Sequence, residues 1–506
     1  MTGFRAYTSR LGLGALIATL WLCPAAHLAL VVVNFATSVV VLALQALVAC
    51  LRRVAPPRRT APVRGPFVSI QVPAHDEPPA VLIETLRHLA RLEWPSYEVL
   101  VIDNNTSDPE RWRPVEGACR ELGPRFRFVH IEGIAGAKAG ALNWARQFID
   151  PRAEYAFIVD ADYQVRPDCL RRAFAHVTDR RTALVQFPQH YRNVTRDNAA
   201  LALEFRHFFA SYMHAANRLG CVPSTGTLTL IDLDALRTVG GFDTSIITED
   251  AELGFRLLRR GYRAIFVDEP VGAGLLPLDL AGLKKQRWRW AFGNAQVLRG
   301  AWRELLFGRA LTRRQKLGCL SHMTAWFNFN LIPSLSLVFL AIAAATGRLA
   351  PSQHAIIFLS AATLASFLAL RFVTVAVGLR RDGNGWRAVL AAFVTHLGLG
   401  WIFSSSWISC LWDRRSRFVR TNKFIAHVVP GQLRWMMTEL ATGVLLLAAC
   451  ASMAIADLVA GPLAALAFAA IRFGIVWVLH QARATYEITA RQVETRRAAP
   501  EEANAA

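Results

Sequence analysis

Long apolar runs stand on both sides of a more polar central block. Residues 11–51 are almost wholly apolar, with a break near Cys23-Pro24 and arginines on both flanks. Basic flanks at both ends favour a two-helix membrane hairpin whose ends face the cytoplasm. A cleaved signal peptide is the alternative, because Leu11 to Cys23 is a short apolar core followed by small residues. The second apolar run that follows at once favours the hairpin.

Apolar texture returns after residue 320, and the candidate membrane spans are 325–346, 354–379, 436–457 and 461–480. A further apolar run, Ala388 to Trp412, has arginine pairs on both sides and contains three tryptophans. A single crossing would leave one basic cluster outside the cytoplasm. We therefore interpret this run as an interfacial or re-entrant helix. The pattern predicts six crossings in all.

The central block has a different texture, in which short β-rich runs alternate with helical stretches. The expected strands are 67–72, 98–103, 126–130, 155–160, 183–187, 227–231 and 263–267. This alternation predicts a mainly parallel α/β sheet, whose ligands bind at the carboxyl ends of the strands. The predicted division is a membrane hairpin at 1–54, a linker at 55–66, an α/β domain at 67–315, membrane hairpins at 316–380 and 426–482, an interfacial helix and loop at 381–425, and a cytoplasmic tail at 483–506.

Composition supports a membrane protein and narrows the classes of partner. Apolar residues make up 53% of the 506 residues, and the formal net charge is +20. The lysines and arginines gather largely beside the apolar runs, which is typical of cytoplasmic anchoring and not of nucleic-acid binding. Eight cysteines are scattered without Cys-x-x-Cys spacing. They indicate neither a disulfide framework nor a zinc site.

Two acidic residues, Asp160 and Asp162, follow the apolar run that begins at Tyr155. The period-two geometry of a strand would point both carboxylates the same way. Two hard oxygen ligands so arranged suit Mg²⁺ or Mn²⁺ held jointly with a diphosphate. A solvated turn at a strand end is the alternative.

Other polar residues follow two further strands of the predicted sheet. Asp103 opens an Asp-Asn-Asn-Thr-Ser-Asp run, and Pro73-Ala74-His75-Asp76-Glu77 ends the first strand. Either could be an ordinary Asx turn. Side by side, the two ends form a polar crevice suited to the base and ribose of a nucleoside. Lys138, inside Gly136-Ala-Lys-Ala-Gly140, adds a cation at a helix start, where a phosphate binds well.

Two more motifs fall on predicted helices. Thr248-Glu249-Asp250 begins a helical run, either as a cap with acids that complement the dipole or with Asp250 as a general base for an acceptor hydroxyl. Gln286, Arg289 and Trp290 share one helix face. The indole can stack on a sugar ring and the guanidinium can neutralise a diphosphate. An interfacial basic-aromatic helix is the alternative, which also fits Lys284, Lys285, Arg287 and Trp288.

The order of these four motifs resembles the processive membrane-integrated members of glycosyltransferase family 2, which include cellulose, hyaluronan, chitin and bacterial β-glucan synthases. The resemblance spans residues 65–425. Residues 418–423, Phe-Val-Arg-Thr-Asn-Lys, look like the gating loop of the cellulose synthases, with Arg420 in place of Val. The Arg-Thr form of this loop looks most like bacterial synthases of β-(1,3)-type glucans. His75-Asp76 departs from the Tyr-Asn often found in the family, and Asn422 departs from its Pro.

The resemblance implies a Rossmann-like, glycosyltransferase-A-type domain on a bundle of about six transmembrane helices. It implies an inverting polymerase of β-linked glucan in the inner membrane, with UDP-glucose as donor and the growing polysaccharide as acceptor. The implied donor-binding residues are Pro73, Ala74, Glu77, Asp103, Lys138, Asp160, Asp162, Gln286 and Arg289, with Mg²⁺ or Mn²⁺ on Asp160 and Asp162. The implied catalytic residues are Asp250 and Glu249, the acceptor-binding residues Thr248 and Trp290, and the gating-loop residues Phe418, Arg420, Thr421 and Lys423.

Two rival functions stay open at this point. A non-processive enzyme that adds one sugar to a lipid acceptor would use nearly the same donor site. A transporter or receptor could use the α/β domain only to bind a nucleotide, although acidic residues in a repeated intramembrane arrangement are missing. The Gln-x-x-Arg-Trp motif and the gating-loop match favour polymerisation.

Overall fold

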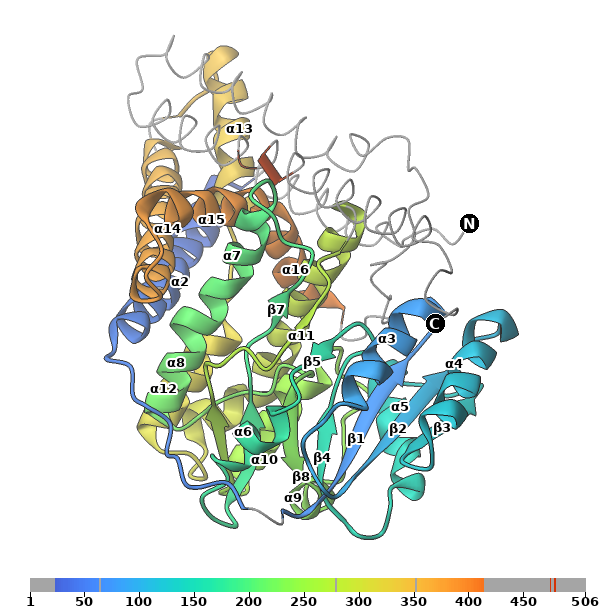
Figure 1. Ribbon diagram of the computed structural model, residues 1–506. Helices are drawn as coiled ribbons and strands as arrows, with labels where there is room; N and C mark the ends of the chain where they lie inside the picture. The colour runs from blue at the N-terminus through green and yellow to red at the C-terminus, as the bar shows by residue number, and fades with distance from the viewer. Residues whose placement is uncertain are drawn as a thin grey trace.

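The computed structural model describes residues 23–62, 65–277, 280–350 and 353–413, together with Gly474, Trp477 and Val478. Its centre is a seven-stranded sheet (Figure 1). The strands are β1 (Phe67–Ala74), β2 (Tyr97–Asn104), β3 (Phe126–Ile131), β4 (Ala153–Ile158), β6 (Thr182–Gln186), β8 (Thr229–Asp232) and β9 (Arg263–Phe266), in the order β3-β2-β1-β4-β8-β6-β9. The seven strands predicted from the sequence are therefore confirmed, within a few residues at their ends.

The sheet is mainly parallel, as expected. Strand β2 pairs in parallel with β1 and β3, β4 with β1, and β9 with β6. Strand β8 is the exception, because it runs antiparallel to both of its neighbours, β4 and β6. A second sheet of three short strands, β5 (Gln164–Val165), β10 (Gly272–Gly274) and β7 (His190–Tyr191), was not predicted. Strands of two or three residues are too short to show an alternating pattern.

Helices cover both faces of the main sheet. Helices α3 (Pro79–Leu89), α4 (Pro109–Leu122) and α6 (Cys169–Phe174) pack on one face. Helices α5 (Ala137–Ala145), α9 (Leu233–Thr238) and α10 (Glu249–Arg259) pack on the other. Alternate residues of each strand supply the two cores: Val99 and Val101 of β2 point to the first, Leu100 and Ile102 to the second. The carboxyl ends of β1, β2, β3 and β4 are left together at one edge.

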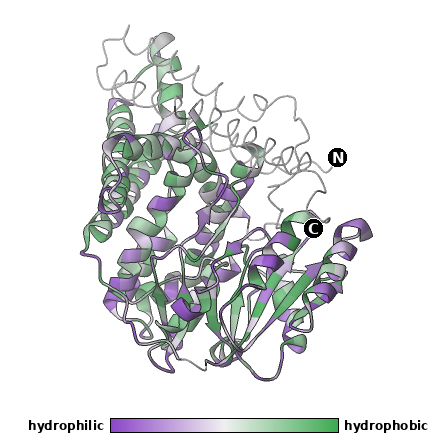
Figure 2. Cartoon of the chain, in the orientation of Figure 1, coloured by the Kyte–Doolittle hydropathy of each residue, from purple (hydrophilic) through white to green (hydrophobic). Residues whose placement is uncertain are grey.

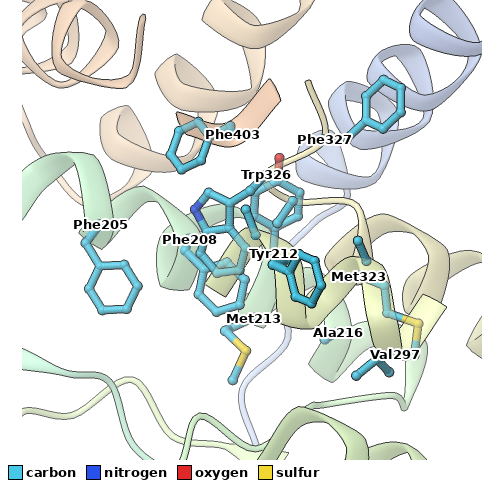
Figure 3. Packing of buried hydrophobic residues seen from close by; sticks show 14 of the residues in the cluster. Phe205, Phe208, Tyr212, Met213, Ala216, Val297, Met323, Trp326, Phe327 and Phe403 are labelled. Carbon is cyan, nitrogen blue, oxygen red and sulfur yellow. The ribbon is translucent and has the colours of Figure 1, made fainter. Parts of the chain in front are cut away.

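A third core, formed mostly by helices, joins the sheet domain to the apolar helices. It contains α7 (Ala199–His207), a π-helical turn η2 (Phe208–Met213), α8 (His214–Leu219), α11 (Leu280–Phe307), α12 (Arg313–Met323) and α16 (Gly400–Trp412). Figure 3 shows its aromatic centre, where the rings of Phe208 and Trp326 stack with centroids 4.9 Å apart. The start of α12 has a capping box between Thr312 and Gln315.

Two helices are long and apolar enough to cross a membrane, α2 (Pro24–Cys50) and α14 (His354–Arg381). They pack side by side, and Figure 2 shows both as mostly hydrophobic. Helix α13 (Leu331–Ala345) has 15 residues and is shorter than the predicted span 325–346, because the chain turns and extends before Leu331. Helix α15 (Trp386–Gly398) meets α16 at a 45° bend, as a broken span or a re-entrant segment does.

The prediction of six crossings is therefore larger than the two or three that the described residues contain. The runs before Cys23 and at 436–457 lie outside the described residues, as does 461–480 apart from Gly474, Trp477 and Val478. The interfacial placement of the run from Ala388 to Trp412 stays a prediction.

Ion pairs tie the sheet domain to the ends of the two long apolar helices. Asp382, just after α14, accepts from Arg53, which follows α2, at 2.7 Å and from Arg206 of α7 at 2.8 Å. Arg206 also pairs with Asp268, beyond β9, at 2.6 Å. Because these side chains are largely shielded from solvent, the network orients the sheet domain on the helices better than scattered surface pairs would.

Candidate active site

The first part of the site is the edge where β1, β2 and β3 end together. Asp103 of β2 lies opposite Ala74 of β1 on one side and His130 of β3 on the other. Pro73 pairs with the residue before Asp103. The structure therefore brings Pro73, Ala74 and Asp103 side by side, as the strand-end pattern predicted.

Asp103 is held by two hydrogen bonds. Its carboxylate accepts from the Thr106 hydroxyl at 2.7 Å and contacts Nδ1 of His130 at 2.7 Å. Burial raises the pKa of Asp103, although both hydrogen bonds oppose the shift. The Trp112 ring stacks on His130 with centroids 4.6 Å apart. The sequence analysis missed His130 and Trp112, since only the register of β3 and the packing of α4 bring them here.

The segment after β1 folds over the end of β2. Asp76 has a positive φ of 54°, and its backbone N–H donates to the Thr106 hydroxyl at 2.8 Å. Its carboxylate lies 3.1 Å from Nε of Arg111. His75 bonds through Nδ1 to the Asn104 carbonyl at 2.7 Å. Glu77 follows in the same turn, so the acid-bearing ends of β1 and β2 lie together at one polar edge of the sheet.

Lys138 lies in the first turn of α5, and its ammonium group reaches the next part of the site. The helix starts after Gly136, whose φ of 86° favours glycine. The Lys138 ammonium donates to Asp160 at 2.5 Å and to the Gly226 carbonyl at 2.6 Å. Burial alone would lower the pKa of Lys138, but the surrounding carboxylates outweigh it and raise this pKa. Lys138 therefore favours its charged form beside Asp160.

Asp160 and Asp162 lie on a turn and not on an extended strand, so the expected period-two alternation is wrong. Strand β4 already ends at Ile158, and the Tyr163 N–H donates to the Asp160 carbonyl at 3.0 Å, which closes the turn. The backbone N–H of Asp160 donates to the Thr227 hydroxyl at 3.0 Å. Asp162 is buried and accepts from the Leu275 N–H at 2.7 Å.

The donor set of this turn fits a divalent cation. Two carboxylates offer hard oxygen ligands, and Mg²⁺ or Mn²⁺ bound by two such groups keeps positions for phosphate oxygens and water. Asp160 and Asp162 are the described residues that would hold the ion. Lys138, bonded to Asp160, would lie beside the phosphates that share it.

Gly226 brings Asp250 close to Lys138. A Cβ at Gly226 would lie 2.6 Å from Oδ2 of Asp250, and the φ of Gly226 is 80°. Its carbonyl accepts from Lys138. Glycine is therefore required at position 226 for two reasons, the backbone conformation and the close approach of the Asp250 carboxylate. The sequence analysis missed Gly226, since a single glycine before a strand carries no signal of this contact.

We expect Gly226→Ala to lower the activity of this site and to cost about 1–3 kcal/mol of backbone strain at this position. The methyl group would collide with Asp250, so the loss of activity should exceed the loss of folded protein. The matched control is Gly117→Ala, because a Cβ there meets nothing within 4 Å. Activity and apparent unfolding temperature, measured on both variants, check this. Equal activity in the two variants would contradict the assigned contact.

The Thr248-Glu249-Asp250 motif starts α10, as predicted, but Thr248 does not cap the helix with its side chain. Its hydroxyl is buried and has no hydrogen-bond partner among the described residues. Thr248 packs against α11, where a Cβ at Gly293 would lie 2.3 Å from it. Burial raises the pKa of both Glu249 and Asp250, and Lys138 opposes the shift. An orphan hydroxyl and acids poised to take a proton suit a site for a hydroxyl substrate.

Helix α11 carries Gln286, Arg289 and Trp290 to the same region. Gln286 is buried. Burial lowers the pKa of Arg289, while the charges of Glu249, Asp160 and Asp250 oppose the shift. The Trp290 ring is half-buried and stacks on Phe205 with centroids 4.4 Å apart.

Arg287 is not part of an interfacial basic surface, and that alternative is wrong for this residue. It is fully buried and pairs with Glu204 of α7 at 2.9 Å. Its guanidinium lies 4.5 Å from the ring centroid of Trp290. Glu204 also contacts His396 of α15 at 3.1 Å. The pair fixes the helix that carries Trp290. It could not be predicted from local patterns, because Glu204 and Arg287 lie far apart in the chain.

The predicted gating-loop residues, Phe418, Arg420, Thr421 and Lys423, lie outside the described residues. The described site therefore consists of the polar ends of β1 and β2, the acids around Lys138, and the side of α11 that carries Gln286 and Arg289.

Known proteins share this chain's sequence over the site. The model of glycosyl transferase family group 2 matches residues 155–479, and the model of glycosyl transferase family 2 matches residues 69–240. A cellulose synthase catalytic subunit (UDP-forming) of Xanthomonas axonopodis pv. citri is 30% identical over 274 residues, 52% of this chain and 36% of that protein. Glucomannan 4-beta-mannosyltransferase 7 of Arabidopsis thaliana is 27% identical over 244 residues, 46% of this chain and 44% of that protein.

A solved structure, the mannosyltransferase PcManGT from Pyrobaculum calidifontis in complex with GDP-Man and Mn²⁺, matches 73% of this chain and 99% of its own with a TM-score of 0.49 and 23% identity. The chain spans less than half the length of the two curated relatives named above. The mixed sheet and the family models together confirm the glycosyltransferase-A-type α/β domain that the motifs implied. With a family model that covers most of its length, including Asp160, Asp250 and the α11 motif, the chain belongs to glycosyl transferase family group 2.

Proposed function

We propose that this protein is an inverting, processive glycosyltransferase that polymerises a β-linked glucan from UDP-glucose. It would lie in the inner membrane with its sheet domain in the cytoplasm and pass the product across the bilayer. The observation that carries this proposal is the meeting of Lys138, Asp160 and Asp250 around Gly226, at the same edge of the sheet as Asp103.

The donor would lie across the carboxyl edge of the sheet. Pro73, Ala74 and Asp103 would bind the uridine end, since they lie together where β1 and β2 end. Glu77, in the turn that follows β1, would join them. Lys138 and Arg289 would neutralise the diphosphate, and the buried Gln286 would support it from α11. When bound at Asp160 and Asp162, Mg²⁺ or Mn²⁺ would stabilise the charge that builds on the leaving group.

The acceptor would approach from the side of α10 and α11. Asp250 would take the proton of the acceptor hydroxyl as its oxygen attacks the anomeric carbon, while the bond from that carbon to the diphosphate breaks and UDP leaves. Attack from the face opposite the leaving group turns an α-linked donor into a β-linked product. Glu249 is the second acid of this pair, and the negative charge of Asp250 raises its pKa. Thr248 would hydrogen-bond the acceptor, and Trp290 would stack on its terminal sugar.

Polymer synthesis is favoured by the two relatives named above, a UDP-forming cellulose synthase and a glucomannan mannosyltransferase. A gating loop at Phe418, Arg420, Thr421 and Lys423 would close over the bound diphosphate. An Arg-Thr loop favours a β-(1,3)-type glucan, as in the bacterial synthases that it resembles.

Incorporation of radiolabelled sugar by the purified full-length protein tests the proposal. The donors are UDP-glucose, UDP-N-acetylglucosamine, GDP-mannose and UDP-galactose, and the product is sized and its linkages are analysed. We expect label from UDP-glucose in long β-linked chains. Label confined to a lipid-extractable product with one sugar would instead support the single-sugar transferase. Nucleotide binding without turnover of any donor would support a transporter or receptor and overturn the proposal.

Asp162→Asn is expected to weaken metal-dependent UDP binding by about tenfold or more. Replacing a residue that only supports a metal ligand already lowers metal affinity about tenfold, and Asp162 would be a ligand itself. The control is Asp150→Asn, at the opposite edge of the sheet, where Asp150 pairs with Arg152. Calorimetric titration of UDP with and without Mn²⁺ checks this. A metal requirement that is the same in both variants would remove Asp162 from the metal site.

The double replacement of Thr421 and Lys423 by alanine is expected to reduce polymer length and amount while UDP still binds. Lys423 would add one charge and Thr421 one hydrogen bond to the diphosphate in the closed state. Product sizing and UDP titration on the same preparation check this. Polymer of normal amount and length would make the segment a plain connector.

A further inference from the structure

Three metal-binding side chains, Cys221, Cys319 and His322, meet away from the donor site. Two sulfur atoms and one imidazole nitrogen all lie within 4.8 Å of one another. Cys221 follows α8, whereas Cys319 and His322 lie three residues apart on one face of α12. The three residues are 2%, 1% and 4% exposed. The fold therefore gathers them in the helical core and not on a surface.

The position of the Cys221 sulfur is defined from both sides. Cys221 follows Gly220, which has a φ of 69°, and its N–H donates to the Ala216 carbonyl at 3.0 Å. On the other side, a Cβ at Gly318 would lie 2.2 Å from this sulfur. Only glycine at position 318 lets α12 approach the thiol so closely. Figure 3 shows two residues of the surrounding apolar core, Ala216, which bonds to the Cys221 N–H, and Met323, which follows His322 in the chain.

We propose that Cys221, Cys319 and His322 bind a Zn²⁺ ion. Thiolate and imidazole are the ligands that zinc prefers, and they discriminate against Mg²⁺ and Ca²⁺, which prefer oxygen. Two thiolates and a neutral imidazole carry two negative charges, which Zn²⁺ balances. A neutral assembly suits an apolar core, where an unbalanced charge would be expensive. Three protein ligands leave one coordination position to be filled by another donor.

This zinc ion would be distinct from the ion at Asp160 and Asp162, and its role would be structural. Cys221 begins the segment that leads to Gly226 and Thr227, which bind Lys138 and the backbone of Asp160. Zinc would link the start of this segment, at Cys221, to α12. The sequence analysis indicated no zinc site, because the Cys and His ligands come from two distant segments and lack the usual close spacing.

The test is the metal content of the full-length protein, purified without added chelator and exchanged into Mg²⁺ buffer. We expect about one zinc per chain, since a buried Cys–Cys–His set binds zinc tightly at neutral pH. Cys319→Ser and His322→Asn should each lose most of it. The matched control is Cys169→Ser, because Cys169 is also fully buried but lies in the sheet core, away from the three ligands. Replacement by Co²⁺ should give a thiolate-to-cobalt charge-transfer band in the wild type and not in Cys319→Ser.

A second measurement on the wild type does not depend on folding of the variants. A zinc-selective chelator, with Mg²⁺ in excess, should raise the alkylation rate of Cys221 and Cys319 several-fold and leave that of Cys169 unchanged. Three results would overturn the proposal: zinc content no higher than in Cys319→Ser, a Cys221–Cys319 disulfide in the purified protein, or copper at the site in place of zinc. Failure of sugar transfer would not affect it, because neither readout uses activity.

Discussion

Asp250→Asn should lower sugar-transfer turnover by about 100-fold or more, while UDP affinity changes little. The side chain keeps its size beside Gly226, so the fold should be retained. What is lost is the carboxylate that takes the acceptor proton. Steady-state turnover and UDP titration on one preparation separate the two effects.

The matched control for this variant is Asp234→Asn. Asp234 lies in the first turn of α9, as Asp250 lies in that of α10, but its side chain is 87% exposed and pairs with Arg237. Near-normal turnover in Asp250→Asn would remove this residue from the mechanism. If turnover fell in Glu249→Gln and not in Asp250→Asn, the base would be Glu249. Burial also raises the pKa of Glu249.

Arg287→Met should produce the largest loss of stability, about 3–5 kcal/mol, because it leaves the buried Glu204 carboxylate without its main counter-charge. Trp290 also loses the guanidinium that lies 4.5 Å from its ring. The apparent unfolding temperature should fall markedly. The control is Lys285→Met, on the exposed side of the same helix, which should leave the apparent unfolding temperature nearly unchanged.

The double variant Glu204→Gln with Arg287→Met distinguishes an ion pair from simple packing. Replacing both partners removes the uncompensated charge, so stability should recover in large part. A double variant as unstable as Arg287→Met alone would show that lost packing, and not the buried charge, causes the effect. Sugar transfer should recover less, because Trp290 still lacks its cationic partner.

The seven main strands could be predicted because apolar runs of four to eight residues alternate with helical stretches. The neighbouring ends of β1 and β2 followed from the parallel order alone. The turn at Asp160 could not be predicted, since the alternation does not show where β4 stops. Its end at Ile158 depends on long-range bonds, among them the one from Asp160 to Thr227.

The missed residues share one physical cause. His130 reaches Asp103 through strand register, Gly226 reaches Asp250 through a close backbone approach, and Arg287 reaches Glu204 across two helices. Each contact joins segments that are distant in the chain. Local periodicity reports which residues are buried or exposed, but it carries no information on which distant partner they meet.

The most direct test of the donor site is an electron cryo-microscopy structure of the full-length protein in a lipid nanodisc with UDP and Mn²⁺. We expect density for the ion between the diphosphate and the carboxylates of Asp160 and Asp162, with Lys138 against the phosphates and the base beside Asp103. Nucleotide bound elsewhere, or diphosphate density that does not contact Asp160 and Asp162, would contradict it.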